Sequence, residues 1–132
     1  MKRIELNLID SYGWTEYFAD GPLADRYAQF VEEASTENTV TPTIIIYEVY
    51  RKIKKTKGEE RALEAYAQIS YTRIVELTDS LSMQAADISL KKGLGMADSI
   101  IVATAKAYNA EIITSDIHLK EGENVKFIGN DH

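Results

Sequence analysis

Four acidic residues lie within or directly beside apolar segments, where a carboxylate is costly to bury. Asp10 follows the alternating segment IELNLI, and Asp116 follows the apolar segment EIITS. Glu48 lies within TIIIYEVY, and Asp98 precedes the apolar run SIIVATA. The four are far apart in sequence, so only the fold could bring them together. Four carboxylates in one crevice would repel each other and raise each other's pKa unless cations compensated.

Metal chemistry is what such a group of carboxylates would support. Mg²⁺ and Mn²⁺ are hard divalent cations that prefer oxygen ligands. A site of this kind activates a water molecule and stabilises the charge that develops on a phosphodiester during in-line displacement. Ser11, Thr114 and Ser115 adjoin two of the acids, so their hydrogen bonds could orient the metal ligands.

Each acid also has a purely structural interpretation. Aspartates at strand ends commonly cap the next helix or form Asx turns, which would account for Asp10 and Asp116. Glu48 could take an exposed side of a helix and pair with the basic residues three and four positions later. Asp98 would be favoured in the first turn of a helix by the helix dipole. The sequence leaves these alternatives open.

The elements that must position the acids alternate between short strands and helices. Ser11 is the expected cap of the first helix, Pro22 the expected first residue of the second, and Asp79 or Ser80 the expected cap of the fifth. The isoleucines after Pro42 favour a helix, although they could also extend the preceding strand. This alternation predicts a three-layer α/β/α domain over residues 1–132, with a central, mostly parallel sheet of about five strands. Strands are expected at 4–9, 38–41, 73–77, 111–115 and 125–128, and helices at 11–19, 22–34, 42–57, 59–71, from 79 or 80 toward 91–95, and 96–109.

Composition narrows the class of protein. The chain has no cysteine, which excludes disulfides, zinc ribbons and thiolate nucleophiles. It carries no apolar run of signal-peptide or membrane-span length, so we expect a cytoplasmic protein without membrane contact. Its formal net charge of −6 argues against a protein that coats nucleic acid non-specifically.

Basic residues nevertheless cluster directly after Glu48. Residues 51–61 hold six of the fifteen lysines and arginines, and those closest to Glu48 are Arg51, Lys52, Lys54 and Lys55. If Glu48 faces the site, this cluster would lie at its rim and could hold RNA phosphates. The alternative is a solvated helix end whose lysines complement the helix dipole. The aromatic residues of 12–18 could stack bases, or belong to the core or to a dimer contact.

The residues resemble the PIN-domain ribonucleases, most closely the VapC-type toxins of prokaryotic toxin–antitoxin systems. The matching blocks are NLIDSYGWTEYF, TPTIIIYEVYRK, LGMADSIIVATAKAYNAEIITSD and VKFI, which together span essentially the whole chain. The resemblance implies a PIN-like fold and a Mg²⁺- or Mn²⁺-dependent endoribonuclease that cleaves single-stranded RNA and inhibits translation. It also implies a cognate antitoxin, and we expect a homodimer.

Carried over residue by residue, the resemblance places the catalytic metal ligands at Asp10, Glu48, Asp98 and Asp116. Thr114 matches the hydroxyl residue two positions before the last acid. His118 and Leu119 depart from the family pattern, in which a phenylalanine often stands three residues after that acid. The acidic net charge is a second departure, because a toxin that cuts RNA is expected to be more basic.

Three other readings compete with the toxin. A receiver-like signalling module should carry paired acids after its first strand and a lysine after its fifth, but Asp10 is followed by Ser11 and no lysine follows VKFI. A PIN fold that only binds RNA or a partner remains open. A PIN nuclease for RNA processing also remains open, although the extra zinc-binding or RNA-binding segments frequent in such proteins are missing from this sequence.

Overall fold

All the strands of the computed structural model, which describes residues 6–129, run parallel to their neighbours. β1 (Leu6–Ile9), β4 (Ala110–Thr114) and β5 (Val125–Phe127) form a sheet in the order β1–β4–β5. β2 (Val40–Pro42) and β3 (Arg73–Val75) form a second sheet.

Within residues 6–129, one parallel bridge, between Asn7 and Thr39, joins the two sheets. The prediction of a parallel sheet is confirmed, but one continuous sheet of about five strands is wrong, because the larger sheet has three strands. β2 is only three residues long and ends at Pro42, which has no N–H to donate, so β1 and β2 share too short a border for a ladder.

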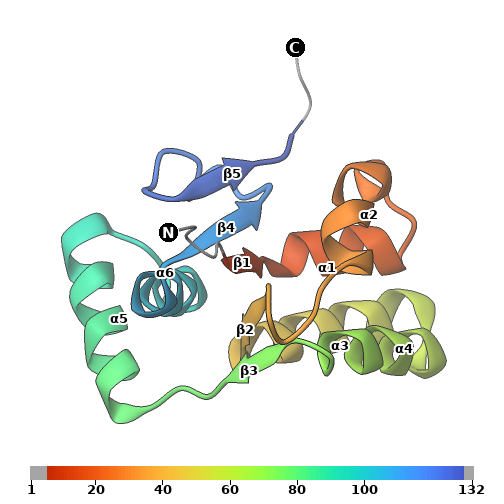
Figure 1. The fold of residues 1–132 in the computed structure, drawn as a ribbon, viewed down its shortest axis with the longest axis horizontal. Helices are drawn as coiled ribbons and strands as arrows, with labels where there is room; N and C mark the ends of the chain where they lie inside the picture. The colour runs from red at the N-terminus through yellow and green to blue at the C-terminus, as the bar shows by residue number, and fades with distance from the viewer. Residues whose placement is uncertain (1–5, 130–132) are drawn as a thin grey trace.

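Helices cover both faces of the strands, as the three-layer prediction requires. Figure 1 shows α1 to α4 on one side of the strands and α5 with α6 on the other. α6 packs against β4 and β2, whereas α5 packs against α6. The helices are α1 (Ser11–Phe18), α2 (Ala24–Glu32), α3 (Thr43–Lys57), α4 (Glu59–Ile69), α5 (Asp79–Lys92) and α6 (Met96–Tyr108).

The central strands are short apolar segments buried between these helices. Leu8 and Ile9 of β1, and Ile112 and Ile113 of β4, are at most 1% exposed. Asn7 and Glu111 are only half-buried, so each strand is buried most fully at its second half, where the apolar residues are consecutive. The polar residues that directly follow these strands therefore leave the core at one edge of the sheet.

The first helix starts differently from the expectation. Asp10, rather than Ser11, is its N-cap, and Asp10 Oδ1 accepts the Ser11 N–H at 2.7 Å. The residue that caps a helix has an extended backbone and stands just before the first helical residue, and Asp10 satisfies this with a ψ of 163°. The structural interpretation of Asp10 as a cap is thus correct as far as it goes, but it accounts for only one carboxylate oxygen.

Two other helix starts were placed wrongly by a few residues. Thr78, rather than Asp79 or Ser80, caps α5, because its hydroxyl accepts the N–H of the third helical residue at 3.2 Å. α2 begins at Ala24, since Pro22 lies in the turn before the helix. The segment after β2 is helical from Thr43, which settles the choice between helix and strand there.

Gly13 allows α1 to pack closely on α2 and β1. A Cβ at this position would lie 2.6 Å from Tyr27 Cδ1 and 2.7 Å from Ile9 Cγ2, and both neighbours are fully buried. Gly13→Ala is therefore expected to destabilise the protein by about 1–3 kcal/mol through overpacking, measured as a lower thermal midpoint. Gly95→Ala is the comparison: a Cβ there meets nothing within 4 Å, and only the N-cap of α6 is changed, so the midpoint should fall less. Equal midpoints for the two variants would contradict the close packing.

Candidate metal centre

The first acid lies beside a threonine because β1 and β4 end side by side. Ile9 pairs with Ile113 in the parallel register, and the Asp10 N–H donates to the Ile113 carbonyl at 3.0 Å. The Thr114 hydroxyl donates to Asp10 Oδ2 at 2.7 Å and accepts the Asp116 N–H at 2.9 Å. One hydroxyl thus connects the acids that follow two neighbouring strands.

Asp10 is 2% exposed, although it is charged in its ordinary state. Burial raises its pKa above the usual value, and the nearby charge of Asp116 raises it further. The hydrogen bonds from Thr114 and from the Ser11 backbone oppose this shift. The site therefore supplies donors to both oxygens of Asp10, and no cationic side chain of residues 6–129 forms an ion pair with it.

Asp98 reaches the same crevice from the first turn of α6. Atoms of Asp98, Asp116 and His118 that could ligate a metal all lie within 4.8 Å of one another. Burial raises the pKa of Asp98 to about 7, together with its hydrogen bond to Asp116 and the charges of Asp116, Asp10 and Glu48. Asp98 would thus hold a proton near neutral pH unless a cation took its place.

Asp116 is fixed by hydrogen bonds on both sides. Its backbone N–H is held by Thr114, and its Oδ1 accepts the His118 N–H at 2.8 Å. His118 Nδ1 lies 3.0 Å from the same oxygen, while the imidazole itself is largely exposed. His118 is thus an exposed histidine that contacts one of the four acids.

Glu48 enters the crevice from α3 with an unsatisfied oxygen. Glu48 Oε1 is buried and has no hydrogen-bond partner within residues 6–129. Burial raises the pKa of Glu48, and the charges of Asp10 and Asp116 raise it further, whereas a hydrogen bond with Ser11 lowers it. Within the described part of the chain Glu48 makes no ion pair with Arg51 or another basic residue. The exposed, paired glutamate that was the structural alternative is not found.

The three hydroxyl residues next to the acids play different parts. Thr114 holds two acids, and Ser11 donates its backbone N–H to Asp10. Ser115 does not turn toward the acids. Its hydroxyl is hydrogen-bonded to that of Tyr27, a fully buried residue of α2 whose pKa burial raises to about 12. Ser115 therefore ties the segment that carries Asp116 to α2, and nothing in the local sequence indicated Tyr27.

The basic residues after Glu48 lie exposed along α3. Lys54 Nζ is 3.1 Å from Glu59 Oε1 and so is partly neutralised. Arg51, Lys52 and Lys55 form no ion pair within residues 6–129. Arg51 and Lys52, the two cations nearest to Glu48 on α3, thus lack an ion-pair partner in the described part of the chain.

Tyr12 lies near enough to the acids for the charges of all four to act on its hydroxyl. Its pKa is raised first by burial and then by the charges of all four acids. Its side chain is 49% exposed, whereas Trp14 and Phe18 of the same helix are buried. The aromatic residues of α1 therefore divide between the core and the rim of the crevice.

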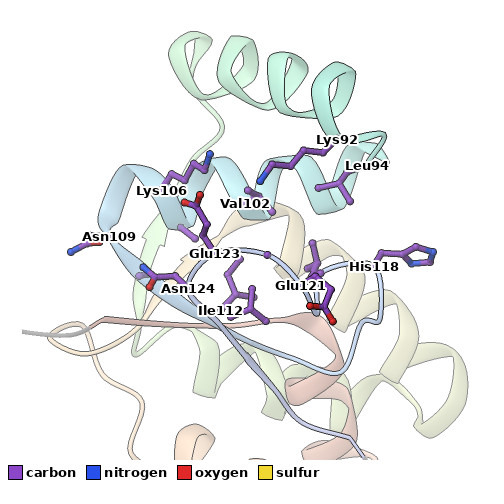
Figure 2. A pocket seen from close by; sticks show the side chains of 15 residues that line it. Lys92, Leu94, Val102, Lys106, Asn109, Ile112, His118, Glu121, Glu123 and Asn124 are labelled. Atoms are coloured by element: carbon purple, nitrogen blue, oxygen red, sulfur yellow. The ribbon is translucent and has the colours of Figure 1, made fainter.

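A separate hollow of about 650 Å³ lies between α6 and the segment that precedes β5. Figure 2 shows Asn109 and His118 at its opposite ends, with Lys106 and Glu123 between them. None of the four acids lines this hollow, and its charged residues are exposed. The chemistry that burial and charge indicate is therefore at the acidic crevice.

The sequence pattern of the family described as PIN domain matches residues 8–124. The chain belongs to the PIN domain family. The match includes all four acids, and the parallel strands flanked by helices form the α/β fold expected of a PIN domain.

Solved structures with similar folds include a toxin–antitoxin complex and a toxin. A toxin–antitoxin complex from Klebsiella pneumoniae superposes with a TM-score of 0.74 at 21% identity, covering 91% of this chain and 95% of the other. VapC20 from Mycobacterium tuberculosis, described as a toxin that cleaves the sarcin–ricin loop, gives a TM-score of 0.71 at 13% identity, with 87% and 94% covered. VapBC2 from Rickettsia felis, bound to a promoter DNA fragment, gives 0.69 at 20% identity, with 93% and 97% covered.

These identities are low, so the likeness establishes the fold of this PIN domain and not its activity. No curated protein sequence gives a significant match to the chain. Within residues 6–129, none of the helices is both long enough and apolar enough to cross a bilayer.

Proposed function

We propose that this PIN domain is a metal-dependent endoribonuclease of the VapC type, which cleaves single-stranded regions of RNA and thereby inhibits translation. The observation that carries the proposal is the grouping of the acids: Thr114 joins Asp10 to Asp116, ligand atoms of Asp98 and Asp116 lie within 4.8 Å of each other, and Glu48 Oε1 is buried without a hydrogen-bond partner within residues 6–129. Leaving a buried carboxylate oxygen without a partner is costly, and a bound cation would remove that cost.

The residues of the crevice fit a hard divalent cation. All four side chains offer carboxylate oxygens, which are the ligands that Mg²⁺ and Mn²⁺ prefer. Burial first, and then the neighbouring carboxylates, raise the pKa of Asp98 to about 7 while only protein groups surround it, and a bound cation would oppose both effects. We therefore propose Asp10, Glu48, Asp98 and Asp116 as the metal ligands.

A cation held there would act as a Lewis acid and would neutralise the charge that develops on the phosphodiester during hydrolysis. The chain's own residues orient the ligands. Thr114 fixes Asp10 relative to Asp116, and the His118 N–H fixes the other side of Asp116. α1 and α6 both begin at the crevice, so the positive ends of their dipoles partly offset the repulsion between the acids.

RNA is the substrate that the surrounding charges favour. Arg51, Lys52 and Lys55 follow Glu48 on α3 without ion-pair partners in the described chain, and Lys54 adds a partly neutralised charge. Such residues bind phosphates without regard to sequence. By analogy with the toxin–antitoxin complexes of similar fold, we propose a cognate antitoxin that restrains the enzyme. A cytoplasmic homodimer remains part of the proposal.

The proposal is tested by incubating the purified protein with a labelled single-stranded RNA oligonucleotide, with Mg²⁺ or Mn²⁺ and with EDTA. Internal cleavage is expected with either cation and is expected to stop in EDTA, since the acids alone cannot stabilise the charge on the phosphodiester. The same RNA annealed to its complement is the matched control and should be cut much less. Undiminished cleavage in EDTA would contradict the metal mechanism, and no cleavage with any divalent cation would favour a binding module.

A further inference from the structure

A hollow of about 630 Å³ opens between α1 and α3, next to the acids. Ser11 and Glu48 line the hollow and also contact the metal centre, so the two spaces are continuous. The other residues on which the argument depends are Tyr12 on α1 and Tyr47, Arg51 and Lys52 on α3. Its volume falls within the range of about 300–1,000 Å³ that is usual for small-molecule sites.

Two aromatic rings stand exposed in this hollow. Tyr12 is 49% exposed and Tyr47 is 62% exposed, from two different helices. A tyrosine that served the core would be buried, as Tyr27 is. Exposed aromatic rings within a basic groove are the usual platforms on which the bases of single strands stack.

Two cations lie on α3 about one helical turn beyond Tyr47 and Glu48. Arg51 follows Tyr47 by four positions on α3, and Lys52 follows Glu48 by the same spacing, so each pair shares a helix face. Neither cation forms an ion pair within residues 6–129. Glu16 and Glu48 line the same hollow, so the two cations offset the acids there and provide the positive charge that a phosphate would need.

A second hollow continues the first along α3. It measures about 550 Å³ and shares Tyr47 and Arg51 with the first, and it adds Tyr50, Lys54 and Lys55. Two tyrosines on α3, Tyr47 and Tyr50, are thus followed by basic side chains that lead away from the acids. This combination fits a flexible polyanion with flat bases better than a folded protein surface, which would need a larger apolar area.

We propose that the hollow between α1 and α3 holds the nucleotide adjoining the scissile phosphate of single-stranded RNA, with its base stacked on Tyr47 or Tyr12 and its phosphate on Arg51 and Lys52. The strand then continues along α3 past Tyr50 and Lys55. This inference rests on the proposed function, because it names the path by which the same substrate reaches the same acids. Duplex RNA cannot use the hollow, since its bases are already stacked and paired.

Titration of a labelled single-stranded RNA by fluorescence anisotropy, in EDTA to prevent cleavage, tests the inference. Tyr47→Leu is expected to weaken binding about five- to thirtyfold while leaving the slope of log Kd against log salt unchanged, because stacking releases no counterions. Arg51→Gln is expected to weaken binding and to reduce that slope by about 0.7. Tyr71→Leu and Lys91→Gln, which change exposed residues of the same types elsewhere, are the matched controls and should bind like the wild type.

The outcomes separate this inference from the proposed function. If the wild type cleaves RNA but both hollow variants keep its affinity and salt slope, the hollow is not a nucleotide site and the nuclease proposal stands. If the wild type neither binds nor cleaves single-stranded RNA, both proposals fail. If the variants bind RNA normally but escape inhibition by the antitoxin, the hollow is a protein-docking surface and the inference is overturned. Tyr47 and Arg51 are exposed, so the variants should fold, and thermal unfolding verifies this.

Discussion

Asp10→Asn is expected to lower RNA cleavage by about 10³-fold or more while the protein stays folded. Asp10 is the most deeply buried of the four acids, and it is held by hydrogen bonds to both of its oxygens. Removing its charge would weaken the cation site, and such sites contribute several kcal/mol of stabilisation to the developing charge. A loss of about 4 kcal/mol corresponds to about a thousandfold in rate. The measurement is the initial rate of RNA cleavage with saturating Mg²⁺ or Mn²⁺.

The fold should survive this substitution because asparagine has the same shape as aspartate. The amide oxygen can still accept the Ser11 N–H, so the cap of α1 is retained. Asp87→Asn, which changes an exposed acid of α5, is the matched control and should cleave RNA like the wild type. In cells, induced wild-type protein is expected to arrest growth and the Asp10 variant to be harmless. Cleavage by the Asp10 variant at the wild-type rate would rule out this metal site, and harmless wild-type expression of an active enzyme would favour RNA processing over toxicity.

The sequence was sufficient to place the acids on elements, since that depends on local patterns. Apolar alternation ended at Asp10, an apolar run ended before Asp116, and glycines preceded the helix of Asp98. Asp10 and Asp116 come together only because β1 and β4 are neighbours in the sheet. The structure shows this pairing, with Ile9 opposite Ile113. The pairing of segments so far apart in sequence depends on the packing of the whole core. Local sequence patterns therefore could not predict that these two strands are neighbours.

Long-range contacts were what the sequence could not reveal. Tyr27 and Ser115 are 88 positions apart, and no local pattern marks their hydrogen bond. The burial of Glu48 Oε1 depends on how α3 packs against α1 and the sheet, although the sequence around Glu48 allowed an exposed helix face equally well. The division of the sheet depends likewise on how briefly β1 meets β2.

Without a divalent cation, the protein is expected to lose stability as the pH rises from about 4 through about 7. The folded-state pKa of Asp98 is about 7, above the ordinary value of 3.8, so the folded chain holds a proton there more tightly than the unfolded chain does. This contribution is complete below the unfolded pKa and is lost as the pH passes the folded one. Because Asp98 is only half-buried, solvent screening reduces the effect to about 1–2 kcal/mol. Asp10 and Glu48, whose pKa values are also raised, act in the same direction.

A bound cation and an Asp98→Asn substitution should each prevent this loss of stability at high pH, because each reduces the repulsion between the acids. Mg²⁺ or Mn²⁺ binds the folded site and not the unfolded chain, so either should raise the thermal midpoint at pH 8 by mass action. Asp98→Asn removes one of the four repelling charges, so the metal-free variant should unfold at a higher temperature than the wild type at pH 8, and added cation should stabilise it much less. Asp87→Asn should match the wild type in both respects. Differential scanning calorimetry at pH 4, 6 and 8, with EDTA and with each cation, measures these shifts.

A structural aspartate at the start of α6 predicts the opposite sign, because losing a charge that favours the helix dipole would lower the midpoint of the Asp98 variant. The sign of that one shift therefore distinguishes a cation site from an ordinary helix start.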